Sequence, residues 1–333
     1  MSIEGIAYAL PSVLHTAADI AAATGAEEAF IADKVGLKTR YVLGPEETGI
    51  GLSVTACQKL LERHPELARD GVDLLVCVTQ NPDRRIPHNA PGIAQALGLP
   101  AQVASFDISL GCSGYVYGLE IVEGFLQRCG LRHAILVTCD PYTRVMAPED
   151  RDTNCIFGDA ATATWVSANG TRSQTLAVDF GTDGAGSSAI EIPAGGAAQP
   201  QVSLLGPADV QQHTREELKL HMRGRAVFNF VLSRIPASLQ NCLERAGMSL
   251  DQIDLFALHQ GSIYMLDALA RRAGIPDAKV LKNMGRYGNT VSSTIPLLLA
   301  ELQDRDELRS RTVLLSGFGV GLSWSTAIIR FAP

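Results

Sequence analysis

The sequence predicts an α/β protein built from two similar halves, and three observations support this. Strand-like apolar runs alternate with segments of helical periodicity, an order that produces parallel βαβ units. Short segments of the first half recur in the same order in the second. The chain has 333 residues, 46% of them apolar and 19% charged, so it can bury a sizeable core and is neither disordered nor fibrous.

Two runs at 72–79 and 134–139 are short and continuously apolar, as expected for strands buried on both faces. Helical periodicity occurs in five further segments, at residues 53–64, 91–97, 114–129, 216–246 and 263–273.

The internal similarity is found in three places. Residues 71–80 resemble 252–260, residues 133–138 resemble 311–316, and Gly-rich apolar segments follow at 157–166 and 318–329. A shared order favours duplication over chance likeness, so we expect halves at 1–170 and 171–333. Residues 181–207, rich in Gly, Ala, Ser and Pro, are expected to form a surface excursion, either a lid or an inert loop.

Charge and cysteine usage narrow the class of protein. A net charge of −7 and a pI near 5.5 argue against nucleic acid as the main partner. We see neither a signal-peptide pattern nor an apolar run long enough to span a membrane. Seven scattered cysteines without a CxxC pair are typical of reduced, buried thiols in a cytoplasmic protein, and six are expected to be packing residues.

Cys112 is the exception. Gly111 and Gly114 flank it, and a helix that is apolar nearly all round follows, which places that helix in the centre of the protein. The positive end of the helix macrodipole favours a thiolate, and the glycines allow a strained turn and close substrate approach. Cys112 is therefore a candidate nucleophile, with an ordinary buried thiol as the alternative.

Two later segments carry polar side chains suited to the same site. His259 ends the strand-like run at 253–258, and ligand sites collect at that edge of α/β sheets. Asn289 lies in a Gly-punctuated loop ahead of an apolar helix at 295–302. Either residue alone would more often be structural, but the set of three favours a catalytic site.

These segments resemble β-ketoacyl-acyl-carrier-protein synthase III and its relatives in the thiolase superfamily. The likeness covers nearly the whole chain. It includes the Cys112 turn and the segments at 35–40, 156–160, 259–260, 288–290 and 316–324. It implies a five-layered αβαβα fold of two duplicated halves, usually a homodimer. It also implies an acyltransferase of fatty-acid or specialised-metabolite biosynthesis that uses acyl-CoA as a substrate and needs no cofactor or metal.

The resemblance further implies a decarboxylative Claisen condensation. Cys112 takes the acyl group of an acyl-CoA. A malonyl thioester, on acyl carrier protein or CoA, then loses CO2 while His259 and Asn289 donate hydrogen bonds to its thioester oxygen. The carbanion attacks the acyl group, whose oxyanion is expected to rest on the backbone N–H groups of Cys112 and Val320.

Binding positions are also implied by the resemblance. Phe30 and Arg151 match residues that stack on the CoA adenine, and Lys34 matches one that meets a CoA phosphate. Arg271 and Arg272 match a basic pair that receives the acidic carrier protein.

Two positions expected near the carrier-docking region depart from the family pattern. Tyr264 stands where an arginine is usual and Asn229 where a lysine is expected, although Arg223 and Arg225 lie about one turn earlier. We therefore expect altered carrier docking or a different acceptor.

The expected acyl pocket departs as well. Ile86 replaces an aromatic gate and follows Arg84 and Arg85, which we expect either to pair with a polar acyl primer or to be a solvated pair. Tyr264 and Ile86 favour a specialised pathway.

Four alternatives remain at this point. A type III polyketide synthase would use the same three residues without a carrier, but Val320 interrupts the usual GFGPG turn. A degradative thiolase needs a second cysteine, and none follows Cys242. A papain-like protease fits the spacing of Cys112 and His259, but not the local sequence. A binding-only homologue would not need the intact triad.

Overall fold

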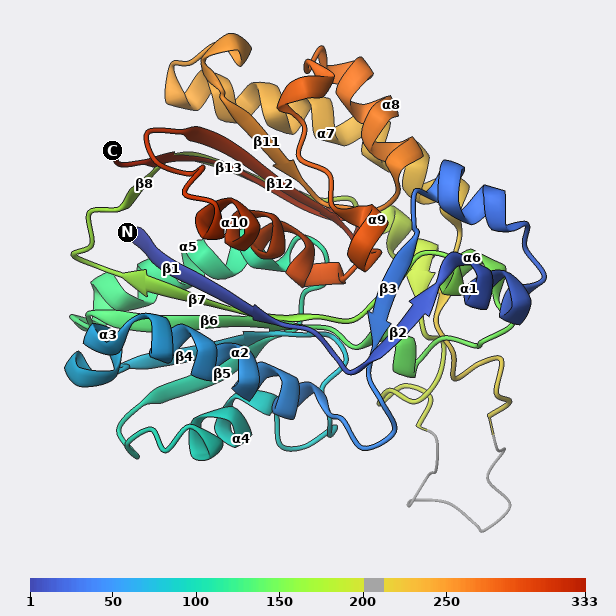
Figure 1. The fold of residues 1–333 in the computed structure, drawn as a ribbon, viewed down its shortest axis with the longest axis horizontal. Helices are drawn as coiled ribbons and strands as arrows, with labels where there is room; N and C mark the ends of the chain where they lie inside the picture. Colours follow the sequence, from blue (N-terminus) through green and yellow to red (C-terminus); the bar gives the residue numbers. More distant parts are fainter. Residues whose placement is uncertain (201–212) are drawn as a thin grey trace.

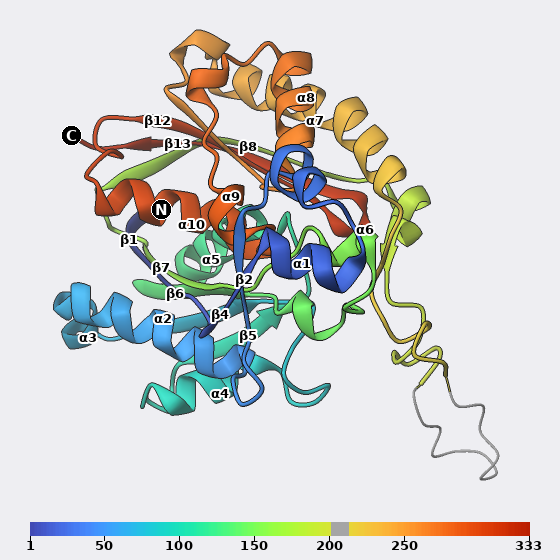
Figure 2. The same ribbon diagram turned by 45° about the vertical axis from the view of Figure 1, so that its right-hand side comes forward.

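Two β-sheets, each lying between layers of helices, make up the computed structural model of the chain, which describes residues 1–200 and 213–333. Figure 1 shows five layers: α2 to α4, the first sheet, α5 with α10, the second sheet, and α7 with α8. Figure 2 shows the same order after a turn of 45°. The αβαβα arrangement expected from the sequence is therefore present. Residues 201–207 of the expected excursion lie outside the described residues.

The first sheet has five strands in the order β1-β7-β6-β4-β5. Strand β4 is parallel to both of its neighbours, whereas β7 is antiparallel to both of its own. Strand β4 is buried along its whole length and β6 from Ala134 to Cys139, which explains the two continuous apolar runs in the sequence. The strands are β1 (Ser2–Ala9), β4 (Leu74–Val78), β5 (Ala104–Ile108), β6 (His133–Cys139) and β7 (Ala161–Ser167).

The second sheet repeats this arrangement. Its order is β11-β12-β13-β8, with β11 parallel to β12 and the other pairs antiparallel. Val280 forms an isolated parallel bridge to Phe256 of β11, where the fifth strand would lie. The equal order supports the division near residue 170, which stays a prediction. The strands are β8 (Ser173–Thr182), β11 (Leu255–Leu258), β12 (Thr312–Gly319) and β13 (Ser323–Phe331).

The helices of the layers follow most of the expected segments. Two of them, α5 and α8, have the expected bounds because each ends at a left-handed glycine, Gly130 (φ 65°) or Gly274 (φ 69°). The bounds are α2 (Gly49–Arg63), α3 (Pro65–Asp70), α4 (Asn89–Ala96), α5 (Gly114–Cys129), α7 (Gly224–Ala246), α8 (Ile263–Ala273) and α10 (Thr294–Asp304).

The helix expected from residue 216 was predicted too long, because α7 begins only at Gly224. The preceding residues form β10 (His221–Met222), which pairs with β9 (Ile190–Glu191). At His221 and Met222, hydrogen bonds to a strand about 30 residues earlier in the chain replace the hydrogen bonds of a helix. A pattern of neighbouring residues carries no information about such a distant partner.

Smaller elements gather at one end of the layers (Figures 1 and 2). Strand β2 (Val13–Thr16) pairs with β3 (Thr39–Val42), and α1 (Ala17–Thr24), α6 (Arg151–Asn154) and α9 (Met284–Tyr287) lie nearby. Thr16 and Asp19 form a capping box that starts α1.

Six of the seven cysteines are buried, as expected, but Cys129 is exposed. It is the last residue of α5, and residues 127–130 around it are all exposed. Within the described ranges, no helix combines the length and apolar character needed to cross a membrane.

Candidate active site

A pocket of about 520 Å³ brings together residues from both halves of the chain. Cys112 lies just before α5, His259 follows β11, and Asn289 lies between α9 and α10. All three line this pocket, and their exposed fractions are only 4%, 3% and 4%. The fold therefore assembles the three candidate residues at one site.

The end of β12 packs directly against Cys112. A Cβ placed on Gly317 would lie 2.5 Å from the Cys112 carbonyl oxygen, and one on Gly319 would lie 2.7 Å from Cys112 Sγ. Glycine is therefore required at both positions, because any side chain would displace the candidate nucleophile. The next residue, Val320, also lines the pocket, and its backbone N–H approaches the Cys112 sulfur.

The ionisation of Cys112 differs from what its helix position predicts. Burial raises the pKa of the thiol to about 12, and the carboxylate of Asp140 adds to this increase. The backbone N–H groups of Val320 and Cys112 itself lower it by less. Desolvation therefore outweighs the stabilising surroundings of the thiolate, and the thiol is protonated at neutral pH.

Asn289 is held by backbone and side chain. Its N–H donates to Ile156 O (2.9 Å), and its carbonyl accepts from Gly158 N (3.0 Å). Its side-chain Oδ1 accepts the N–H of Val291 (2.9 Å). Because Oδ1 is occupied in this way, the amide Nδ2 is left to act as a hydrogen-bond donor in the pocket.

His259 is fixed on two sides. Its backbone N–H donates to Ser316 O (2.9 Å), and its ring meets the Phe318 ring edge-on with centroids 5.5 Å apart. Nδ1 lies 2.8 Å from the hydroxyl oxygen of Thr294. Burial lowers the pKa of His259 to about 3, so the imidazole is neutral at physiological pH.

A buried carboxylate behind Cys112 was not anticipated from the sequence. Asp140 accepts hydrogen bonds from the Ser292 hydroxyl (2.5 Å), Gln80 N–H (2.7 Å) and the Thr79 hydroxyl (3.2 Å). Burial raises its pKa to about 6. Asp140 thereby ties the ends of β4 and β6 to the turn that follows Asn289.

The mouth of the pocket contains several residues singled out in the sequence. Arg225, Asn229 and Tyr264 line it, and the Tyr264 ring stacks on Phe228 with centroids 5.4 Å apart. The guanidinium of Arg223 instead donates to Ser188 O (2.7 Å). The remaining predicted docking residues, in the last turn of α8, are exposed: Arg271 and Arg272.

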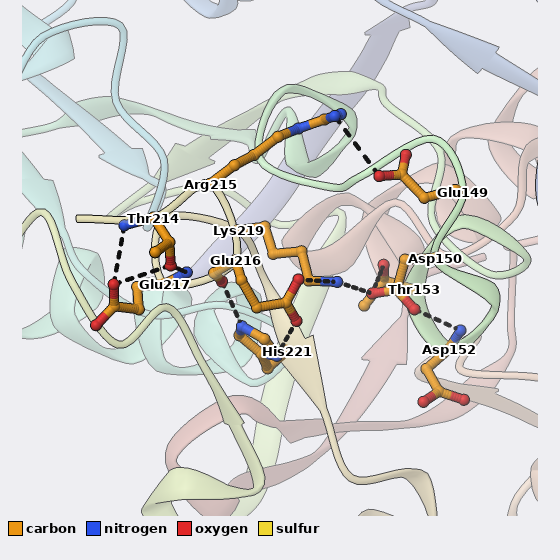
Figure 3. A network of polar contacts seen from close by, with 10 residues as sticks. All are labelled: Glu149, Asp150, Asp152, Thr153, Thr214, Arg215, Glu216, Glu217, Lys219 and His221. Carbon is orange, nitrogen blue, oxygen red and sulfur yellow. Dashed lines mark hydrogen bonds and ion pairs between the residues drawn. The ribbon is translucent and has the colours of Figure 1, made fainter. Parts of the chain in front are cut away.

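The predicted CoA-binding residues lie outside the lining of this pocket. Phe30 and Lys34 belong to a π-helical turn, Phe30–Val35, and Arg151 is the first residue of α6. Figure 3 shows a network of polar contacts that includes Asp152 and Thr153 of α6 and its N-cap residue Asp150. Within it, Lys219 Nζ lies 3.7 Å from an Asp150 carboxylate oxygen, which joins α6 to residues 214–221.

The predicted acyl-pocket residues are also separate from the Cys112 pocket within one chain. Arg84, Arg85 and Ile86 lie on the loop between β4 and α4 and do not line it. The Ile86 side chain is 88% exposed. Their contact with an acyl group stays a prediction.

Comparisons with known proteins decide the family. The profile of 3-oxoacyl-[acyl-carrier-protein] synthase III matches residues 106–184, and that of its C-terminal region matches 243–331. A β-ketoacyl-[acyl-carrier-protein] synthase III of Roseiflexus castenholzii is 31% identical over 332 residues, covering 99% of this chain and 98% of the relative. The chain belongs to the 3-oxoacyl-[acyl-carrier-protein] synthase III family.

Solved structures agree with this assignment. A crystal structure of a 3-oxoacyl-(acyl-carrier-protein) synthase III superimposes with a TM-score of 0.91 and 34% identity, covering 99% of each chain. The priming β-ketosynthase of the R1128 polyketide biosynthetic pathway gives 0.87 and 25%, covering 99% of this chain and 96% of the other. The predicted thiolase-like fold and the predicted class, a condensing acyltransferase, are confirmed.

The synthase III fold also contains two neighbours of the site that the sequence did not reveal. The carboxylate of Asp140 acts electrostatically on Cys112, and the hydroxyl of Thr294 is hydrogen-bonded to His259. Gly319, in contrast, lies in the Gly-rich segment at 316–324 that the sequence had already singled out. Within residues 1–200 and 213–333, no group of three or more His, Cys, Asp or Glu is placed to hold a metal ion.

Proposed function

We propose that this synthase III joins an acyl group from acyl-CoA to a malonyl thioester through an acyl-Cys112 intermediate. The assembly of Cys112, His259 and Asn289 in one pocket is the observation that carries the proposal. Acyl-CoA enters as a substrate, and no cofactor takes part.

The first half-reaction transfers the acyl group. The sulfur of Cys112 attacks the thioester carbon, and the backbone N–H groups of Cys112 and Val320 hold the oxyanion. The bond to the CoA sulfur breaks, and the thiol proton of Cys112 ends on the departing CoA thiol. Because burial raises the pKa of Cys112, this step is expected to speed up at alkaline pH.

The second half-reaction forms the carbon–carbon bond. The malonyl carboxylate leaves as CO2, and its electron pair becomes an enolate whose oxygen accepts hydrogen bonds from Asn289 and His259. The enolate carbon attacks acyl-Cys112, and the released thiolate takes a proton from solvent. Two neutral donors suit this role because they stabilise the developing charge without protonating the carbanion.

Intact-mass measurement after incubation with acyl-CoA tests the intermediate. We expect one acyl mass on the wild type and none on Cys112→Ala. The matched control is Cys129→Ala, which removes the exposed thiol and should still be acylated. Acylation of Cys112→Ala at the wild-type rate would refute the proposal.

The acceptor of the acyl group is proposed to be malonyl-acyl carrier protein. Arg225 at the mouth and exposed Arg271 and Arg272 offer cationic groups to an acidic protein. Malonyl-CoA is the second candidate, because the uncharged Asn229 and Tyr264 also line the mouth. Condensation rates with the two malonyl donors at equal concentration distinguish these acceptors.

We further propose a role in a specialised pathway and a homodimeric state. The departures at Tyr264 and Ile86 support the former. Exposed apolar side chains on α5 and β8, Ile121 and Phe180, support the latter, together with Tyr117, whose ring packs at a tilt against Phe180 with centroids 4.6 Å apart. Light scattering of wild type and Ile121→Asp tests the dimer, and a panel of acyl-CoAs tests the primer.

A further inference from the structure

Among residues 1–200 and 213–333, one polar group contacts Nδ1 of the His259 ring. Nδ1 of His259 lies 2.8 Å from Oγ1 of Thr294, the first residue of α10. Both side chains are buried, with exposed fractions of 3% and 1%. Water therefore does not compete for this contact, and the hydroxyl determines what Nδ1 does.

The direction of this hydrogen bond follows from the other groups around Thr294. Its hydroxyl has one proton and two acceptors within reach, Nδ1 of His259 and the carbonyl oxygen of Val291 at 3.1 Å. The Val291 carbonyl already accepts the backbone N–H of Thr294. The hydroxyl can therefore turn toward Nδ1 without leaving a buried carbonyl unpaired.

The opposite direction is less favourable. If Nδ1 carried the proton, Nε2 would present a bare lone pair, and no group of the described chain donates a hydrogen bond to it. That lone pair would repel the substrate oxygen that His259 is proposed to stabilise.

We propose that Thr294 is a positioning residue whose hydroxyl donates to Nδ1 and so places the single proton of neutral His259 on Nε2. This inference rests on the proposed function. The Nδ2 amide of Asn289 is freed in a parallel way, because Val291 N–H occupies its Oδ1. One turn, from Val291 to Thr294, thus prepares two donors for one thioester oxygen.

Two variants separate the hydroxyl from the shape of the side chain. Thr294→Val keeps the branched shape but cannot donate, whereas Thr294→Ser keeps the hydroxyl. Release of CO2 from the malonyl thioester reports the second half-reaction, and intact mass reports acylation of Cys112. We expect Thr294→Val to slow CO2 release roughly 10- to 100-fold and acylation less than about threefold. Thr294→Ser should restore CO2 release to within about threefold of the wild type.

A spectroscopic measurement reports the tautomer directly. In protein labelled with 15N-histidine, protonated and bare ring nitrogens resonate far apart, and His259→Asn assigns the signals. We expect a protonated Nε2 in the wild type and in Thr294→Ser. A wild type with its proton on Nδ1 would overturn the inference.

The outcomes distinguish this inference from the proposed function. A wild type that neither accepts an acyl group nor releases CO2 refutes the function itself. If the wild type is active and Thr294→Val matches it in both half-reactions, only the inference fails. Equal slowing of both half-reactions in Thr294→Val, with the Nε2 proton retained, would show a purely structural role and also overturn the inference.

Discussion

Gly319→Ala is expected to slow acylation of Cys112 by about 100-fold while the protein still folds. The new Cβ would lie 2.7 Å from Cys112 Sγ and 2.9 Å from its Cβ. Reaching an ordinary contact of 3.4 Å requires a shift of about 0.7 Å, the difference between these distances. Displacement on this scale at a reacting atom costs roughly two orders of magnitude in rate, and it also moves the Val320 N–H from the oxyanion.

The assay is the time course of acyl mass on Cys112 after mixing with acyl-CoA, with Tm recorded for each variant. Gly184→Ala is the matched control, because a Cβ at that position meets no atom within 4 Å. The position also lies close to the turn that contains Val320, because the backbone N–H of the preceding Asp183 donates to Leu322 O. Acylation of Gly319→Ala at a rate within about threefold of the wild type would refute the assignment of the oxyanion site to the backbone N–H groups of Cys112 and Val320.

Four further predictions concern the site and its supports. Asn289→Asp replaces the proposed donor by a carboxylate, so CO2 release should fall about 100-fold while Cys112 is still acylated; equal loss of both steps would contradict separate roles. Burial lowers the pKa of His259 from 6.5 to about 3, so its contribution to stability is present above pH 6.5 and is lost as pH falls toward 3. The Tm of the wild type should therefore fall more steeply than that of His259→Asn between pH 6.5 and 5, and parallel curves would exclude this. Tyr264→Arg should raise the condensation rate with malonyl-acyl carrier protein relative to the rate with malonyl-CoA. An unchanged ratio of the two rates would show that the residue at position 264 does not influence which acceptor is used. Tyr287→Phe removes the 2.7 Å bond to the Glu301 carboxylate and should cost about 1–3 kcal/mol in urea unfolding; no measurable cost would show that the bond is replaced.

Much of the fold follows from local patterns. The bounds of α5 and α8 were predicted because glycines and apolar periodicity act within a few residues. The start of α7 was not, because the preceding residues pair with β9 far away in the sequence. The exposure of Cys129 escaped prediction for a similar reason, since it depends on where the covering layers end.

The residues of the candidate site also fall into two groups, those with a local signal in the sequence and those without one. Cys112, His259 and Asn289 stood out because each has a local mark, a glycine-flanked turn or the end of a strand. Their neighbours Asp140 and Thr294 carry no such mark. Asp140 meets Ser292 across 152 positions, and Thr294 meets His259 across 35.

The sequence by itself determined the family, the layered fold and the identity of the proposed reactive groups. Only the tertiary structure decided their chemical state. Burial raises the pKa of Cys112 and lowers that of His259, and Val291 and Thr294 set the hydrogen bonds of the two proposed donors. The physical reason is that desolvation and hydrogen-bond direction depend on atoms brought together from distant parts of the chain, which no local pattern records.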